Sequence, residues 1–263
     1  MSRLQSIPCN VFKKYPISCW KKVGNEAKII HRKEIDIGCH VLELYSLTTG
    51  ANSVILPKTN DNSLRLTGRY VYILLRPVED KGFLLHLDIH ASDGLDVRIT
   101  LSNVFTELKL TNLSLHLPFD IQSKGQCGTE WTLLRLDLNT LFSVYHGRKH
   151  QWISRLQLSS SMQILGILVS DISYSIFENK TESIERKSRK PLRFPLFRGT
   201  IFETNNQFSV ANQPVVVRFP EDLDPGVRSK CKLSQVFLTR LFKSGAYNSQ
   251  RMLTVICTNS IKT

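Results

Sequence analysis

The chain has 263 residues and a mass of 30.1 kDa, and 41% of its residues are hydrophobic, which suffices for one large folded domain or two small ones. Thirty-five basic against 22 acidic residues leave a net charge of +13 and a pI near 9.6. The apolar run at 164–169 is far shorter than the ~20 residues of a membrane helix, and residues 1–6 begin no signal-peptide core, so we expect an intracellular protein without a membrane segment.

The basic residues are concentrated in three segments of the chain. Residues 1–33, 180–198 and 228–263 carry net charges of +7, +5 and +7, so the remaining residues together carry −6. A mildly acidic body with basic ends predicts a large polyanionic partner. Basic termini that merely keep the protein soluble are the alternative interpretation.

Short apolar stretches with a period of two recur between residues 40 and 178, separated by Gly, Pro, Asn and Asp. This spacing favours an antiparallel sandwich or barrel over alternating β/α units. The predicted strands, in chain order, are 40–47, 53–56, 70–76, 83–91, 97–101, 113–117, 132–136, 153–158, 164–174 and 215–219.

A hairpin is predicted around Asp93-Gly94. A two-residue loop would mix apolar and polar residues on each face, whereas a three-residue loop at 92–94 places all the apolar residues inward. Gly94 then supplies the left-handed position of a bulged turn. The predicted cross-strand pairs are Leu85 with Leu101, Leu87 with Ile99, and Ile89 with Val97.

One segment departs from the strand pattern and predicts a short helix. Asp137 is suited to cap its first turn, and Gly147 is suited to end it. We assign its apolar stripe to core packing rather than to a partner. The stripe consists of Leu138, Leu141, Phe142 and Tyr145.

Composition divides the chain into a β-sandwich domain at 1–178, a basic linker at 179–200 and a partly disordered basic extension at 201–263. Within the extension, we predict the strand at 215–219 and a basic amphipathic segment at 233–243. A nuclear-import or nucleic-acid patch at 186–190 is the alternative to a solvated linker.

The sequence predicts no catalytic residue, no cofactor and no metal site. Phosphate-binding loops and hydrolase nucleophile motifs are missing, and the six scattered cysteines are expected to be reduced thiols. His86, Asp88 and His90 share one strand face and could bind a metal. The predicted register places Asp88 opposite Arg98, however, so a cross-strand ion pair is the favoured interpretation.

Several short motifs occur in an order that resembles the cilia- and flagella-associated protein 20 domain family. The most specific is the run Leu-Thr-Gly-Arg-Tyr-Val-Tyr-Ile-Leu-Leu-Arg-Pro at 66–77. The likeness covers roughly 7–178, and 217–220 extends it weakly. The other matching segments are 10–12, 20–21, 56–58, 86–88, 102–105, 131–132, 136–138, 144–145 and 169–171.

The resemblance implies a jelly-roll-like antiparallel β-sandwich with one short helix, hence the all-β class. It also implies a microtubule-associated structural role at the ciliary inner junction or in the centriole wall. The implied partners are the tubulin wall and other centriolar or axonemal inner-junction proteins. Long members of the family carry propeller repeats of ~40 residues, and this sequence shows no trace of them.

We therefore predict a non-catalytic, microtubule-associated structural protein of the cytoskeleton, located at the centriole, basal body or ciliary axoneme. Tubulin is acidic, so exposed basic residues are the expected contacts. A nucleic-acid-binding module that uses the basic termini is the alternative function, although no aromatic stacking platform supports it. A sugar-binding sandwich is a further alternative, resting on fold analogy. The candidate contacts, chosen by charge, are Lys13, Lys14, Lys21, Lys22, Arg148 and Lys149.

Overall fold

The structure is a computed structural model that describes residues 8–24, 28–34, 39–59, 62–119, 130–174 and 215–220. All of them belong to one compact unit, residues 1–223. The linker predicted at 179–200 and the amphipathic segment predicted at 233–243 lie outside the described residues, so the boundaries of the three regions stay predictions.

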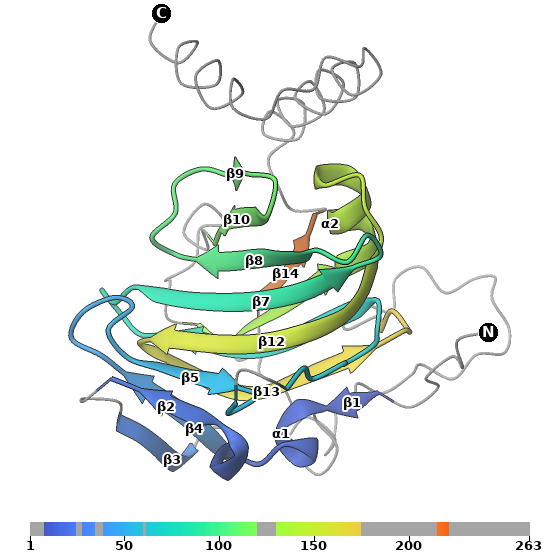
Figure 1. The fold of residues 1–263 in the computed structure, drawn as a ribbon. Helices are drawn as coiled ribbons and strands as arrows, with labels where there is room; N and C mark the ends of the chain where they lie inside the picture. The colour runs from blue at the N-terminus through green and yellow to red at the C-terminus, as the bar shows by residue number, and fades with distance from the viewer. Residues whose placement is uncertain are drawn as a thin grey trace, which may run out of the picture. The chain divides into compact units, whose positions relative to one another are not determined.

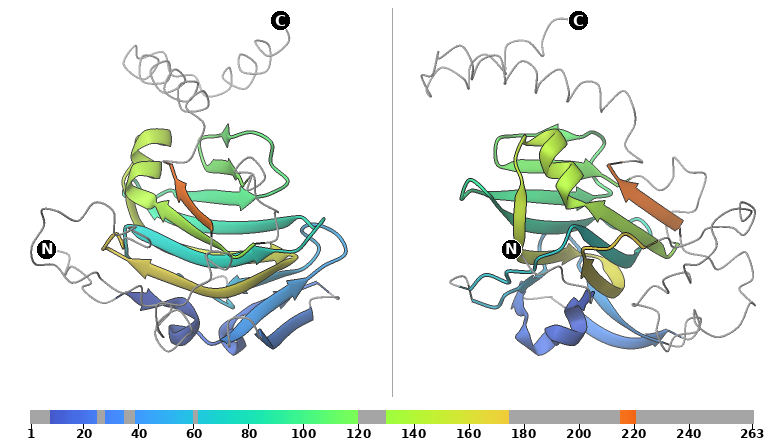
Figure 2. Two further views of the ribbon diagram at one scale, coloured as in Figure 1. Left: turned by 180° about the vertical axis from the view of Figure 1, so that it is seen from behind. Right: turned by 90° about the vertical axis from the view of Figure 1, so that its right-hand side faces the viewer.

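Two β-sheets pack face to face and form a sandwich (Figure 1), which Figure 2 shows from behind and from the side. The front sheet has the order β2 (Lys21–Val23), β5 (Ser53–Leu56), β12 (His150–Ser160), β7 (Phe83–Ala91), β8 (Asp96–Ser102), β10 (Ser114–Pro118) and β9 (Lys109–Leu110). The back sheet has the order β14 (Val215–Phe219), β11 (Thr132–Asp137), β6 (Tyr70–Pro77), β13 (Met162–Ser170), β4 (Cys39–Tyr45) and β3 (Lys28–Glu34), and β1 (Cys9–Asn10) also pairs with β13.

The predicted all-β sandwich is confirmed, and most neighbouring strands are antiparallel. Two pairs are parallel: β8 with β10, and β11 with β14. The strand predicted at 215–219 is present and adds to the edge of the back sheet, with Val217 opposite Leu134. No helix in the described part of the chain is long and apolar enough to cross a membrane.

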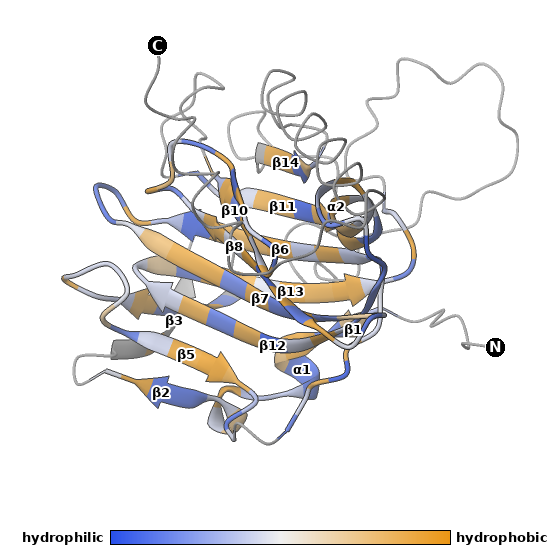
Figure 3. Cartoon of the chain, turned by 45° about the horizontal axis from the view of Figure 1, so that its top comes forward, coloured by the Kyte–Doolittle hydropathy of each residue, from blue (hydrophilic) through white to orange (hydrophobic). Residues whose placement is uncertain are grey.

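The core lies between the sheets and follows the alternation of each strand. In β7, residues alternate between buried and half-buried from Phe83 to Ala91, because one face of the strand meets the back sheet. β6 is buried almost throughout, since its outer face carries a second apolar cluster that contains Tyr72 and Tyr174. The hydropathy colouring in Figure 3 shows β13 as largely hydrophobic, whereas β2 contains a hydrophilic stretch.

The hairpin register is confirmed in all three predicted pairs: Leu85 with Leu101, Leu87 with Ile99, and Ile89 with Val97. Ala91 N donates to Leu95 O at 2.8 Å and closes a three-residue loop at 92–94. Gly94 adopts a φ of 85°, the left-handed conformation that the bulged turn requires.

The predicted helix is α2 (Leu138–Tyr145). The Asp137 side chain accepts a hydrogen bond from Thr140 N at 3.2 Å and caps the first turn. All four residues of the predicted apolar stripe are buried, which confirms its role in the core. Gly147 follows the helix with a φ of 63°.

Sequence reasoning missed the elements at the start of the chain, namely β1, α1 (Val11–Lys14), the short 3-10 helix at Ile17–Cys19, β2 and β3. The short segments β1 and α1 are below the length at which periodicity is informative. β2 and β3 lie at sheet edges, and all three residues of β2 are exposed, so β2 shows no alternation of buried and exposed residues.

Candidate functional site

The segment from Cys9 to Val23 crosses from one sheet to the other at one end of the sandwich. Its first strand, β1, pairs with β13 of the back sheet, and its last strand, β2, pairs with β5 of the front sheet (Figure 1). Val11 is fully buried and Trp20 is 3% exposed, so the segment is anchored in the core at two points. We call this segment, residues 9–23, the bridging segment.

Local contacts fix the fold of the bridging segment between these anchors. Asn10 Oδ1 accepts from Lys13 N at 3.1 Å and caps α1. Trp20 Nε1 donates to Tyr15 O at 3.0 Å, and the rings of Phe12 and Trp20 lie 5.7 Å apart. The apolar side chains thus face the sandwich, and the basic side chains of α1 face solvent.

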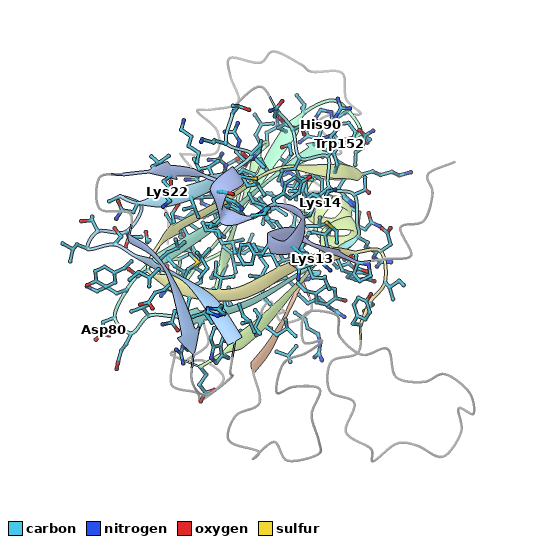
Figure 4. All side chains as sticks on the ribbon, turned by 90° about the horizontal axis from the view of Figure 1, so that it is seen from below. Lys13, Lys14, Lys22, Asp80, His90 and Trp152 are labelled. Carbon is cyan, nitrogen blue, oxygen red and sulfur yellow. The ribbon has the colours of Figure 1, made fainter. Side chains whose placement is uncertain are left out.

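Four of the six predicted contact residues belong to the bridging segment: Lys13, Lys14, Lys21 and Lys22. All four are exposed, and Figure 4 shows three of them, Lys13, Lys14 and Lys22, in a view from this end. Within the described residues, none of the four forms an ion pair, and residues 8–24 contain no acidic side chain. Lys14 Nζ lies 5.4 Å from the centre of the Tyr15 ring, a cation–π distance.

The four lysines do not all face the same way. Lys21 stands opposite Ile55 and Lys22 opposite Val54, which is fully buried. Successive residues of a strand point to opposite faces, so Lys21 lies on the outer face of the front sheet and Lys22 on the opposite face. The pair therefore extends around the exposed edge of β2.

The other two predicted contacts, Arg148 and Lys149, lie elsewhere, just before β12. Lys21 is opposite Ile55, which is opposite Gln157, and Lys149 precedes Gln157 by eight residues. At ~3.3 Å per residue, this places Lys149 roughly 25 Å along the sheet from Lys21. The structure does not bring the six predicted residues into one patch.

Arg148 is also engaged within the protein. Its Nε lies 2.7 Å from Asp93 Oδ2, and its Nη1 donates to Asn112 O at 2.8 Å. The side chain is 16% exposed and connects the β7–β8 loop, the β9–β10 loop and the turn after α2. Lys149 is exposed, and its carbonyl accepts from Ser92 N at 2.9 Å.

At the alternative metal site, the side chains of His86, Asp88 and His90 each interact with a side chain of β8. The predicted ion pair is confirmed, since Arg98 Nε donates to Asp88 Oδ1 at 2.6 Å. His86 Nδ1 lies 2.9 Å from Thr100 Oγ1, and burial, with help from the Arg98 charge, lowers the pKa of His86 to about 4. No group of three metal-ligating residues occurs in the described ranges.

The remaining His90 is held by two contacts. Its Nδ1 lies 2.9 Å from Asp96 Oδ1, and its ring stacks on Trp152 with centroids 4.5 Å apart. Tyr45 is the one aromatic residue among the exposed large apolar side chains in the described part of the chain. This arrangement provides no open row of aromatic rings on which bases or sugars would stack.

Cys9 and Cys19 are free thiols, as expected for a reduced protein. Burial raises the pKa of the Cys9 thiol and outweighs the smaller, opposing effect of the Lys14 charge. The thiol is therefore protonated at neutral pH. The other four cysteines, Cys39, Cys127, Cys231 and Cys257, have side chains outside the described set.

Comparison with known proteins agrees with the fold and the motifs. The family model of the CFA20 domain matches residues 4–186. WD repeat-containing protein 90 of Mus musculus is 29% identical over 227 residues, covering 81% of this chain and 12% of the relative. The protein of the same name from Xenopus tropicalis is 32% identical, covering 68% of this chain and 11% of its own length.

Centriole proteome protein 16 of Chlamydomonas reinhardtii is 24% identical over 169 residues, which is 64% of this chain and 8% of that protein. The chain thus spans about a tenth of the length of these relatives. The family match covers well over half of the chain, and it includes the run at 66–77 on which the sequence resemblance rested. The chain therefore belongs to the CFA20 domain family.

Proposed function

We propose that this chain is a non-catalytic structural module of the centriole, basal body or ciliary axoneme that binds the microtubule wall through the bridging segment. Family membership and the names of the relatives, one of them a centriole proteome protein, support the location. The observation that carries the binding proposal is the set of four exposed lysines on a segment anchored in both sheets.

The physical argument rests on charge and rigidity. Residues 8–24 contain four exposed lysines and no acidic residue, so the bridging segment itself carries a net positive charge. Val11 and Trp20 fix the backbone that carries them, so little backbone ordering is needed on binding. An acidic filament surface would attract this end of the sandwich and accelerate encounter.

Co-sedimentation of the full chain with stabilised microtubules tests the proposal. We expect binding at low salt that weakens as the screening length falls from ~10 Å at 0.1 M to ~3 Å at 1 M ionic strength. The fourfold variant Lys13→Glu, Lys14→Glu, Lys21→Glu, Lys22→Glu should bind at least roughly tenfold more weakly. Its thermal unfolding should change little, because exposed charges contribute little to stability.

Two double variants separate a local site from general attraction. Lys13→Glu with Lys14→Glu should weaken binding, whereas Lys109→Glu with Lys149→Glu, the same change in net charge on exposed residues outside the bridging segment, should not. An equal loss in both variants would show that net charge alone drives association. Failure of the unaltered chain to co-sediment at low salt would replace direct binding with recruitment through another protein.

A further inference from the structure

The bridging segment is smaller than a typical protein interface. It comprises the 15 residues of 9–23, and Val11 and Trp20 among them are buried. A specific, stable interface takes about 20–30 residues from each partner. A segment of this size that binds a filament therefore needs an adjoining surface.

The outer face of the front sheet adjoins the bridging segment without a break. Lys21 stands opposite Ile55, and Ile55 stands opposite Gln157. Gln157 in turn stands opposite His86, so one cross-strand row leads from the edge of the sheet to its centre. At ~4.8 Å per strand, the row spans about 14 Å from β2 to β7. In Figure 1 this face is turned toward the viewer, and no described helix lies over it.

Cross-strand pairs hold the side chains of this face in place. Arg98 donates from Nε to Asp88 Oδ1 at 2.6 Å and from Nη2 to Asp88 Oδ2 at 2.8 Å. Next to this pair, His86 Nδ1 lies 2.9 Å from Thr100 Oγ1. Side chains that are already fixed lose little rotamer freedom on binding, so the face is suited to contact with a rigid surface.

The composition of the face is typical of the centre of an interface. β12, β7 and β8 contain no lysine and no glutamate, which are depleted at interfaces. Arginine and tryptophan are enriched at interfaces, and both occur here. Arg65 Cζ lies 6.0 Å from the centre of the Trp152 ring, and this ring stacks on His90.

The charge of the face complements an acidic partner. Its four basic and two acidic side chains give a net charge of +2. Neither carboxylate stands alone, because Asp88 is paired with Arg98 and Asp96 with His90. The charged residues are Lys21, Arg65, Arg98 and Arg155 against Asp88 and Asp96.

The outer face of the back sheet is closed by comparison. Tyr72, Leu74, Leu133 and Leu168 lie at the centre of its apolar cluster, and each is at most 1% exposed. On the front sheet, the side chain of Arg98 is 43% exposed. Of the two outer faces, the front one is therefore open to a partner at its centre.

We propose that the outer face of the front sheet, from β2 to β8, lies against the microtubule wall together with the bridging segment. This inference rests on the proposed function and adds an orientation to it. Lys21 belongs to this face and contacts the filament, whereas Lys22 points to the opposite side of β2 and does not. The two lysines are adjacent, exposed and equal in charge, so they form a matched pair for a test.

Single charge reversals, compared by co-sedimentation of the full chain with microtubules at ~0.1 M ionic strength, test the orientation. Lys21→Glu should weaken binding at least roughly fivefold. Lys22→Glu should change binding by less than about twofold, because its ammonium group lies on the far side of the strand and the screening length is only ~10 Å. Thermal unfolding of both variants should change little, since exposed charges contribute little to stability.

Photo-cross-linking locates the contact independently of charge. The photoreactive amino acid benzoylphenylalanine in place of Gln157, on the outer face of β12, should cross-link to tubulin when the complex is irradiated. The same amino acid in place of Ser143, which is exposed on α2, should not. Loss of binding by the chain altered at Gln157, with an unchanged unfolding midpoint, would equally support the proposal.

Two outcomes would overturn this orientation and leave the proposed function in place. One is an equal loss of binding in the Lys21 and Lys22 variants, and the other is cross-linking from position 143 but not from position 157. Failure of the original chain to co-sediment at low salt would instead overturn the proposed function, and this orientation with it.

Discussion

Arg69 and Asp137, 68 residues apart in the chain, form a two-pronged ion pair in which Nε donates to Oδ1 at 3.0 Å and Nη2 donates to Oδ2 at 2.7 Å. Asp137 also caps α2 through Thr140, and Leu138 N donates to Arg69 O at 2.9 Å. One buried carboxylate therefore joins the start of β6 to the start of the helix. Both residues belong to motifs that carry the family resemblance. These motifs therefore include the contact that links the start of β6 to the start of α2.

Replacing Asp137 with Ala should lower the free energy of unfolding by about 2–4 kcal/mol, because it removes a helix cap and the buried partner of Arg69. Burial works to raise the pKa of Asp137, but hydrogen bonds from Arg69 and Thr140 outweigh it and hold the pKa below its usual value. The contribution is therefore present at neutral pH and is lost as pH falls through that lowered pKa. Urea unfolding at pH 7 measures the loss.

Asp137→Asn is the matched control, since asparagine caps helices well but carries no charge. We expect its stability to lie between those of the original chain and Asp137→Ala. An asparagine variant as unstable as the alanine variant would show that the cap contributes nothing.

Gly68, next to this joint, packs against β13 without room for a side chain. A Cβ at this position would lie 2.6 Å from Val169 Cγ1 and 3.1 Å from Ser170 N. Gly68→Ala should therefore destabilise the protein by about 2 kcal/mol or more through overpacking. Gly94→Ala, at a φ of 85° with no atom within 4 Å, should cost only the backbone strain of about 1 kcal/mol. Equal losses in thermal unfolding would contradict the close-packing argument.

The elements that could be predicted from the sequence are those whose pattern is local. β7 and β8 alternate because one face is buried, and Gly94 and Asp137 act on neighbouring residues. β3 could not be found this way, because basic residues replace the alternation that burial would impose. An edge strand is recognised only once its neighbour is known.

The candidate site was predictable only in part, for a related reason. Net charge located the basic segment at 1–33, and its lysines are exposed. Net charge could not show that Arg148 forms an ion pair with Asp93 and a hydrogen bond with Asn112. These two residues lie 55 and 36 positions away in the sequence and contact Arg148 only in the folded chain. Counting charges treats a structural arginine and a solvent-facing lysine alike.

Arg148 should accordingly act on stability. Arg148→Ala removes the connection to Asp93 and Asn112 and should lower the free energy of unfolding by about 1–3 kcal/mol. Microtubule binding per folded molecule should be unchanged, in contrast to the lysine variants. Urea unfolding and co-sedimentation of the same preparation give both values. Weakened binding with unaltered stability would show that Arg148 contacts the microtubule, as the sequence analysis predicted.

Two half-buried histidines, His86 and His146, are kept neutral by the fold at pH 7, so the stability of the protein depends on pH. Burial, aided by the Arg98 charge, lowers the pKa of His86 to about 4, and burial aided by the Arg148 charge lowers that of His146 to about 4. Both values lie below the ordinary 6.5, so between these limits the unfolded chain binds more protons than the folded one. Stability should therefore fall as pH drops from about 6.5 towards 4, and no further loss from these groups should follow below that.

Substitution by glutamine isolates this effect, because glutamine does not titrate and can retain the contact of His86 with Thr100. The double variant His86→Gln with His146→Gln should show a flatter dependence of the urea midpoint on pH between 6.5 and 5. This window lies above the ordinary carboxylate pKa values, so acidic residues contribute little there. An unchanged slope in the double variant would mean that other groups cause the acid sensitivity.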